Sequence, residues 1–413
     1  MIPNTYRKVS ATAFGAAGAA LVVWLSFFLE DVGSRNTGIF LILLGVALAC
    51  SLVSSRARVR RLFSWHTDAM LLSYVGILAC NAFFSAARHG AFFAFLCYVA
   101  PAPIVYYLFK SEFADSPIAR WVLVTVNLCA TCVALLAIFE WISKRDIAYE
   151  FLLKNMYYEM YRAQGRSMAT QIHPVNLAAY LCACLPVSWY YAATAGRRIA
   201  RAWGVISALL IVAGIVTTLS RFSLVAVAVS SIVFFRGRQK KTAAALAMAL
   251  VALVCVFSYV RPLRAFHRLS ISMIVFNRSP YQYRLSRMGL AFRMIKDHPV
   301  RGVGLGNFKA AFDRYGDKSE AFHTKTPENS FLLLAVESGL PGLASFLAFL
   351  FFLFKDAAGY LRSRGGSGDL ARCFCAGLAS ILTMMCTYDA LFWTGPAFFF
   401  WMYCGALSSM IYG

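Results

Sequence analysis

Charged residues are scarce in this sequence, and acidic residues are the scarcest. Only 14% of the 413 residues are charged, with 18 Asp and Glu against 40 Lys and Arg, whereas 60% are hydrophobic. Soluble domains are usually about a quarter charged. The mean hydropathy is +0.64, and apolar runs of about 20 residues, each able to cross ~30 Å of hydrocarbon, recur along the chain. The composition excludes an ordinary soluble domain and predicts an all-α membrane protein, because a β-barrel would show ~10-residue alternating segments.

Several sequence motifs of known chemistry are also missing. There is no Asp-x-Asp pair for a metal-bound nucleotide sugar, and no HExxH, Walker A or G-x-S-x-G motif. All twelve cysteines lie in apolar runs, and Cys129-x-x-Cys132 has no histidine or second CxxC nearby, which favours packing residues over a metal or redox pair and predicts no disulfides. We therefore expect no metal and no cofactor. In a membrane protein, the net charge of +22 indicates basic cytoplasmic loops and an anionic ligand, and not nucleic acid.

The apolar runs predict one polytopic domain over residues 1–413, with about twelve transmembrane helices. The predicted spans are 9–29, 37–54, 66–86, 90–109, 119–142, 173–194, 202–219, 221–235, 242–260, 329–354, 371–388 and 392–411. With a cytoplasmic N-terminus, the cytoplasmic loops and termini hold nineteen Lys and Arg and the short outer loops hold two. The positive-inside rule then places both termini in the cytoplasm. Arg7 and Lys8 precede the first span, which we interpret as a retained signal-anchor.

Two long loops are predicted on the outer side, 143–172 and 261–328, and the second holds thirteen Lys and Arg. Within it, residues 283–297 predict an amphipathic helix. Its apolar positions are Met288, Ala291, Met294 and Ile295, and the other faces carry Arg284, Arg287, Arg293 and Lys296. The glycine-punctuated segment that follows, from Gly302 to Phe308, is interpreted as a structural turn, because a phosphate-binding loop would need a preceding strand.

Three arginines are candidates for binding an anion. Ser220-Arg221 interrupts an apolar run from Trp203 to Phe235 that is too long for one span. Arg221 therefore lies either at the tip of a hairpin or inside the membrane, where it would cost at least ~2.5–3.5 kcal/mol without an anionic partner. Arg284 and Arg287 lie one helical turn apart and could grip a diphosphate, because guanidinium groups match phosphate oxygens bidentately. The alternative is a basic helix resting on anionic headgroups.

A carboxylate and three histidines are candidates for proton transfer or support. Glu328 opens the tenth predicted span in Pro327-Glu328-Asn329-Ser330, either as a general base at the membrane surface or as a helix-capping carboxylate. His323 is a second candidate base. His173, with Asn176 at the start of the sixth span, and His298 at the end of the loop helix are each expected to be structural when taken alone.

Four segments, taken in order, resemble the bacterial O-antigen ligase and polymerase family. They are Gly165 to Ala178 at the start of the sixth span, Leu219-Ser220-Arg221, Arg284 to Phe308, and Pro327 to Gly342. The resemblance covers residues 165–345. Members with ligase activity have a histidine immediately before the asparagine of the last segment. Here that position is Glu328, and Pro-Glu-Asn-Ser looks more like the polymerase-type relatives.

The resemblance implies a metal-independent, inverting glycosyltransferase in the bacterial inner membrane, with its site on the periplasmic side. It implies an undecaprenyl-diphosphate-linked glycan as donor, with lipid A-core or a growing polysaccharide as acceptor. Arg221 and Arg284, assisted by Arg287, would hold the donor diphosphate, Glu328 or His323 would accept the acceptor proton, and Asn329, His173 and Asn176 would support the site. Ligase and polymerase remain open.

Two rival classes of function also fit a polytopic chain. One is a transporter or flippase of lipid-linked oligosaccharides, although acidic groups at the membrane midplane, usual in ion-coupled transporters, are few. The other is a receptor or scaffold that binds polysaccharide without turnover.

Overall fold

In the computed structural model of the chain, the described residues are 63–85, 88–113, 118–145, 165–171, 173–236, 280–315, 326–364 and 368–412. Within these ranges the chain is helical and contains no strand. The helices are α3 (Trp65–Phe83), α4 (Arg88–Ala94), the π-helical η1 (Phe95–Val99), α5 (Pro101–Glu112), α6 (Ile118–Ser143), α9 (Pro174–Thr194), α10 (Arg198–Thr217), α11 (Arg221–Phe235), α14 (Pro280–Asp297), α15 (Phe308–Tyr315), α16 (Ser330–Arg364), α17 (Asp369–Met385), the 3-10 turn η3 (Ala390–Phe392) and α18 (Thr394–Tyr412).

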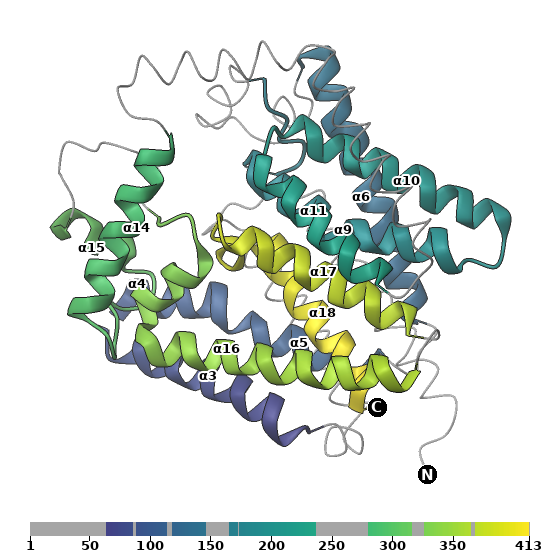
Figure 1. Cartoon of the computed structure of the whole chain (residues 1–413). Helices are drawn as coiled ribbons and strands as arrows, with labels where there is room; N and C mark the ends of the chain where they lie inside the picture. Colours follow the sequence, from purple (N-terminus) through teal and green to yellow (C-terminus); the bar gives the residue numbers. More distant parts are fainter. Residues whose placement is uncertain are drawn as a thin grey trace.

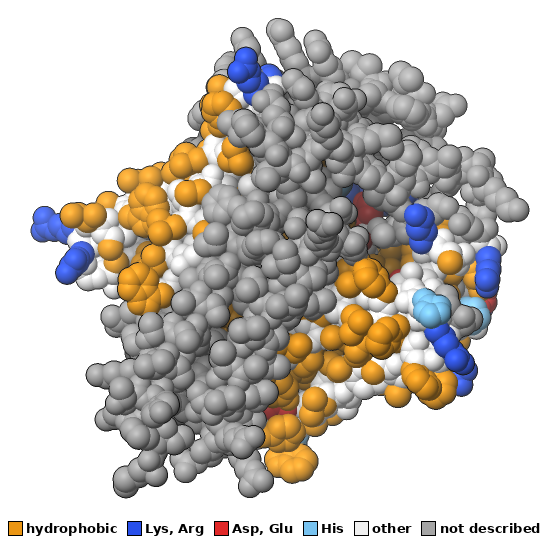
Figure 2. Space-filling model, turned by 180° about the vertical axis from the view of Figure 1, so that it is seen from behind, with side chains coloured by type: hydrophobic (Ala, Val, Ile, Leu, Met, Phe, Trp, Pro, Cys, Tyr) orange, Lys and Arg blue, Asp and Glu red, His pale blue; other side chains and the backbone are white. Residues whose placement is uncertain are grey.

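Five described helical segments are long and apolar enough to cross a membrane: Arg88–Ser111, Trp121–Ser143, Pro174–Thr194, Arg198–Thr217 and Ser330–Arg364. The chain is a multi-pass membrane protein. On the face shown in Figure 2, hydrophobic side chains form broad areas and Lys and Arg side chains stand at the edges. The predicted spans 9–29, 37–54 and 242–260, and most of the two predicted outer loops, lie outside the described residues.

The described helices pack as two adjoining groups (Figure 1). One group contains α6, α9, α10, α11 and α17, and the other contains α3, α5, α16 and α18. They are joined where α18 packs on α17 and α9, and Tyr403 Oη donates to the Ala183 carbonyl at 2.9 Å across that contact. Inside the first group, the Asn127 amide donates to Ser188 Oγ at 2.7 Å and to Ser207 Oγ at 2.9 Å, so that one buried side chain ties α6 to α9 and α10.

The apolar run from Trp203 to Phe235 forms a hairpin, which settles the choice left by the sequence. Helix α10 ends at Thr217, Leu219 has a φ of +52°, and Ser220 precedes the first residue of α11, Arg221. A positive φ is uncommon in a residue with a side chain, and here it reverses the chain within a few residues. Arg221 is exposed at the tip of this turn.

The longest helix, α16, bends at Gly339, whose φ is +74° and ψ is 178°. At the bend, backbone groups of α16 form hydrogen bonds with the glycine-punctuated turn after α14. Val303 N–H donates to the Val336 carbonyl at 2.8 Å and Leu340 N–H donates to the Pro299 carbonyl at 2.7 Å. This docking holds α14 and α15 against the first half of α16, at the end of the bundle where α16 begins (Figure 1).

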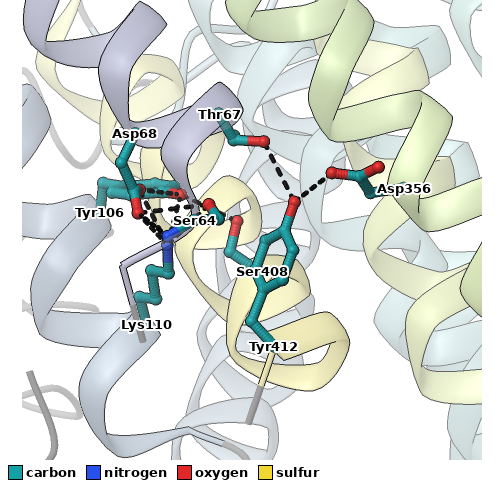
Figure 3. Close-up of polar contacts among 8 residues, drawn as sticks. All are labelled: Ser64, Thr67, Asp68, Tyr106, Lys110, Asp356, Ser408 and Tyr412. Carbon is teal, nitrogen blue, oxygen red and sulfur yellow. Dashed lines mark hydrogen bonds and ion pairs between the residues drawn. The ribbon is translucent and has the colours of Figure 1, made fainter. Parts of the chain in front are cut away.

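A second cluster of polar side chains lies at the start of α3 (Figure 3). Lys110 Nζ contacts Asp68 Oδ2 at 2.6 Å and Oδ1 at 2.8 Å, and both side chains are buried. Tyr106 Oη donates to Asp68 Oδ1 at 2.9 Å and approaches Ser408 Oγ at 3.0 Å. The cluster thereby joins α3 and α5 to the end of α18.

Candidate functional site

Arg287 on α14 lies against the start of α16 and is almost fully buried, with 1% of its side chain exposed. The sequence pattern placed it on the polar side of the helix, and that prediction was wrong. Arg287 shares the packed face with Leu290, Ala291 and Met294. Burial is tolerated because Arg287 Nη1 donates to the Thr326 carbonyl at 3.1 Å and lies 3.5 Å from Glu328 Oε1.

Glu328 lies between the two arginines of α14. Arg284 Nε donates to Glu328 Oε2 at 2.6 Å, and Arg287 approaches the other carboxylate oxygen. The exposed fractions are 47% for Arg284 and 25% for Glu328, so the ion pair opens to the outside while Arg287 forms its inner wall. The two guanidinium groups predicted to grip a diphosphate are therefore both directed at one carboxylate.

Glu328 does not cap α16, so the helix-cap interpretation was wrong. Asn329 Oδ1 accepts a hydrogen bond from Leu332 N–H at 3.0 Å, which is the contact of an N-cap side chain. Glu328 precedes the helix with a φ of +49°. A residue with a side chain is rarely found there, and such strained positions cluster at functional sites.

The start of α16 is tied to the end of α17, which brings Asp389 to the site. Asn329 Nδ2 donates to the Cys386 carbonyl at 2.8 Å, and Ser330 Oγ donates to the Tyr388 carbonyl at 2.9 Å. The pKa of Asp389 is raised to about 6, mainly by burial and also by the neighbouring Glu328, while hydrogen bonds from the backbone and from the Thr326 side chain oppose the shift. Asp389 is therefore a second carboxylate near Glu328 and Arg287.

His173 joins this site to the segment before α9. Its ring stacks on Tyr388, with centroids 5.8 Å apart and planes at 20°. Burial and, to a smaller extent, the positive charges of Arg166 and Arg284 together lower the pKa of His173 to about 3. The imidazole is therefore neutral at physiological pH. Nδ1 accepts from the Val175 N–H at 3.1 Å, which leaves the proton on Nε2.

The segment 165–171 is fastened to the bundle by buried contacts. Glu140 Oε2 accepts from Ala169 N–H at 2.7 Å, and Ser167 N–H donates to the Thr217 carbonyl at 3.1 Å. Arg166 Nε donates to the Thr218 carbonyl at 2.9 Å, beside the turn that presents Arg221. Arg166 is thus held between the α10–α11 turn and His173.

The glycine-punctuated turn does not bind phosphate with its backbone, because its N–H groups already have acceptors within the protein. Gly304 N–H donates to the Glu337 carbonyl at 3.2 Å and Leu305 N–H donates to Asn81 Oδ1 at 2.8 Å. The Glu337 carboxylate accepts from Gly306 and Phe308. A side chain on Gly302 would collide with the carbonyls of α16, which explains a glycine with a φ of +66° at this position. The structural interpretation is the one observed.

The structure gathers most of the predicted site residues, whereas Arg221 is exposed at the tip of the neighbouring α10–α11 turn. Asn176 is buried in α9 and donates to Gln171 Oε1 at 3.1 Å. His323 lies outside the described residues. The sequence interpretation missed Arg166 and Asp389 as site residues. Asp389 could have been suspected because it is the one acidic residue between the last two predicted spans.

The site combines two carboxylates, Glu328 and Asp389, with the guanidinium groups of Arg284, Arg287 and Arg166. Arg284 is its most exposed charged side chain, so the part of the site that faces outward is positively charged. Such an arrangement binds a small polyanion with two phosphate groups better than a neutral ligand, because each guanidinium provides a planar pair of donors. Within the described part of the chain, no three His, Cys, Asp or Glu side chains are arranged to hold a metal ion.

The fold and this cluster define a multi-pass helical membrane protein with a candidate anion-binding site at one end of its bundle. A family model described as O-antigen ligase matches residues 178–347, which include α10, α11, α14, α15 and the start of α16. Over these residues the chain is similar to O-antigen ligases. No curated protein matches the chain.

Proposed function

We propose that this protein transfers a glycan from undecaprenyl diphosphate to a saccharide acceptor, either lipid A-core or a growing polysaccharide. The site would face the periplasm of the bacterial inner membrane, since the positive-inside count places the α10–α11 turn and the start of α16 on the outer side. The family match supports this class of reaction.

The observation that carries the proposal is the placement of Glu328 between Arg284 and Arg287. Both arginines extend from one helix toward one opening, and Arg287 is held rigidly by burial and by the Thr326 carbonyl. A preorganised pair of guanidinium groups stabilises charge that develops on a leaving diphosphate without rearranging during the reaction. It supplies the positive charge that a metal ion provides in other transferases.

In this proposal, Glu328 occupies the arginine pair until the donor arrives. The donor diphosphate, which carries more negative charge than one carboxylate, displaces Glu328 from Arg284. The released carboxylate then accepts the proton of the acceptor hydroxyl. The hydroxyl oxygen forms a bond to the anomeric carbon of the donor sugar. The bond between that carbon and the diphosphate oxygen breaks, and the diphosphate keeps the electron pair. Attack from the face opposite the leaving group inverts the configuration.

Two further side chains would orient the donor. Arg221 at the tip of the α10–α11 turn would contact the diphosphate from the side opposite α14. His173 is neutral and carries its proton on Nε2, so it can donate a hydrogen bond without adding a charge. His323 remains a second candidate base.

The test compares two arginines on the same helix. The full chain in lipid nanodiscs receives an undecaprenyl-diphosphate-linked glycan and an acceptor, and product is measured on gels. Arg284→Ala should lower turnover by about 10²–10³-fold, as the loss of one charge-stabilising donor does in other enzymes. Arg293→Ala, an exposed arginine two turns along α14, is the matched control and should keep turnover within about twofold of the wild type.

The surface glycolipids of a strain lacking the gene identify the acceptor. Bare lipid A-core with polymer left on its carrier indicates a ligase, and core with one repeat unit indicates a polymerase. Normal product from purified Arg284→Ala protein would contradict the proposal. If the strain instead accumulates donor on the cytoplasmic face, the protein is a transporter.

A further inference from the structure

Helix α14 has a second face, on the side away from the one that packs on α16. Leu285, Gly289, Phe292 and Lys296 follow one another along this outer face, because residues three or four apart lie on the same side of a helix. Leu285 is 47% exposed and Phe292 is 57% exposed. A Cβ built on Gly289 would meet nothing within 4 Å, so no described residue covers the middle of the face. The outer face therefore presents apolar side chains away from the fold.

The charged side chains of this outer face are basic. Arg293 and Lys296 are both exposed on it, and neither forms an ion pair within the described residues. Asp297, the one acidic residue in the sequence of α14, is turned toward the Tyr315 hydroxyl of α15. The outer face of α14 thus combines two large apolar side chains with two cations and has no carboxylate of its own.

Two contacts place this helix beside apolar segments long enough to cross a membrane. The Pro299 carbonyl, just after α14, accepts from the N–H of Leu340, which lies within the candidate span Ser330–Arg364. A Cβ on Gly306 would lie 2.8 Å from Ala94 Cβ, in the candidate span that begins with α4. In Figure 1, α14 runs across the end of the bundle beside the start of α16. The helix therefore lies at one end of two candidate spans, where lipid headgroups meet the hydrocarbon.

We propose that the outer face of α14 rests on anionic phospholipid headgroups at this end of the bundle. A helix at the membrane surface inserts its apolar side chains below the headgroups, and its cations attract anionic lipids. Neutral phospholipids would contact the apolar side chains and leave both cations without an anion. A protein partner fits less well, because lysine is depleted at protein–protein interfaces.

This inference goes beyond the proposed reaction and does not depend on it. Arg284 and Arg287 extend from α14 toward Glu328, whereas Arg293 and Lys296 lie on the outer face. The two interpretations of the helix drawn from its sequence, a diphosphate grip and a headgroup contact, are then compatible, because they use different side chains.

The first experiment identifies what touches the outer face. Photoreactive benzoylphenylalanine replaces Phe292 or, in a second variant, Leu285; in the control it replaces Leu128, an exposed apolar residue of α6. The full chain is illuminated in nanodiscs of phosphatidylcholine with about one tenth phosphatidylglycerol, and adducts are identified by mass spectrometry. At positions 292 and 285, phosphatidylglycerol should be enriched about fivefold over its share of the bilayer, the effect of roughly one surface cation. At Leu128 the adducts should follow the bilayer composition.

The second experiment removes the charges. With the photoreactive residue at position 292, Arg293→Gln together with Lys296→Gln should return the phosphatidylglycerol share of the adducts to that of the bilayer. The matched control, Arg197→Gln with Arg198→Gln, removes the same charge from exposed positions at the start of α10 and should leave the enrichment unchanged. Salt at 1 M should also remove the enrichment, since the Debye length is then about 3 Å.

Three results would overturn the headgroup contact. One is adducts at Phe292 and Leu285 with another segment of this chain or with a second copy of it. Another is the absence of adducts at both positions while Leu128 forms them. The third is lipid adducts that follow the bilayer composition, because the cations would then select no lipid. Two labelled positions are used so that misfolding of one variant, detected by thermal unfolding, still leaves a test.

The same variants keep this inference separate from the proposed function. Turnover in the double variant of Arg293 and Lys296 should stay within about twofold of the wild type, since Arg284 and Glu328 are unchanged. If Arg284→Ala keeps full turnover, the transferase function fails and the headgroup contact stands. If Arg284→Ala abolishes turnover while phosphatidylglycerol is not enriched at position 292, only the headgroup contact fails.

Discussion

Two clusters of charged side chains occur at opposite ends of α16, roughly 40 Å apart along the helix, and they differ in balance and exposure. At the start of α3, one buried lysine meets one buried aspartate, and Tyr106 and Ser408 complete the contacts (Figure 3). At the start of α16, two arginines share Glu328, and Arg284 is 47% exposed. Similar residue types are therefore used in two ways.

We infer that the difference separates a structural contact from a candidate binding site. Removing charges from water costs several kcal/mol per ion, and a buried pair recovers that cost only when its partners are complete. The Asp68–Lys110 pair has complete partners and no opening for a ligand. The Glu328 cluster has more positive than negative charge and an exposed side, so an incoming anion can gain contacts there. The following predictions test this comparison, beginning with the largest expected effect.

Replacement of Glu328 by Gln should separate binding from turnover. Loss of the proposed general base should lower turnover by about 10²–10⁴-fold. Loss of the carboxylate that occupies Arg284 and Arg287 should tighten pyrophosphate binding, measured by calorimetry. A structural carboxylate would instead lose stability when replaced, so a large fall in thermal stability without tighter binding would contradict the comparison.

Replacement of Lys110 by Met should act on stability and leave the site unchanged. It leaves the Asp68 carboxylate buried without its cation, which costs about 3–5 kcal/mol. Thermal unfolding in detergent measures the change, and pyrophosphate affinity should stay at the wild-type value. The control is Arg372→Ala, which breaks a partly exposed pair with Asp369 and should cost only about 0.3–0.5 kcal/mol. Equal losses of stability in the two variants would show that burial does not make the Asp68–Lys110 pair more important for stability than a partly exposed pair.

Asp389 should make the stability depend on pH. Its pKa is about 6 in the folded protein and 3.8 ordinarily, so folding favours the protonated form. The stabilisation that this provides is complete below pH 3.8 and is lost as the pH rises through about 6, by roughly 2–3 kcal/mol at about 1.36 kcal/mol per pKa unit. Asp389→Asn should therefore be closer to the wild type in thermal stability at pH 4.5 than at pH 7.5. Identical pH profiles would contradict the burial of this carboxylate.

Replacement of Tyr412 by Phe should have the smallest effect. Its hydroxyl lies 3.1 Å from Thr67 Oγ1 and donates to Asp356 on α16 (Figure 3). Loss of these contacts should cost about 1 kcal/mol, measured by thermal unfolding. Turnover should not change, because the contacts belong to the closed end of the bundle. A fall in turnover would show that the two clusters are coupled through α16.

Much of the helical framework could be predicted because membrane spans are long and uniform in composition. The prediction for α11, 221–235, matches the observed bounds. The predicted bounds of α6 and α9 differ from the observed ones by no more than one residue at each end. The bend at Gly339 and the position of Glu328 before the helix were not predicted, because both depend on contacts with the turn after α14 and with α17. Arg287 was predicted on the exposed side of α14 for the same reason. The pattern of charges along the helix does not show that Glu328 and the Thr326 carbonyl are close enough to stabilise a buried guanidinium group.

The sequence by itself determined the membrane class, the arginine pair on α14 and the resemblance to O-antigen ligases, because hydropathy and motif order are local properties of the chain. Only the tertiary structure decided that Glu328 contacts both arginines and that Asn329 caps α16. It also decided that Asp389 and His173 lie near this cluster. These features bring together residues up to two hundred positions apart, and their pairing depends on helix packing, which no single segment encodes.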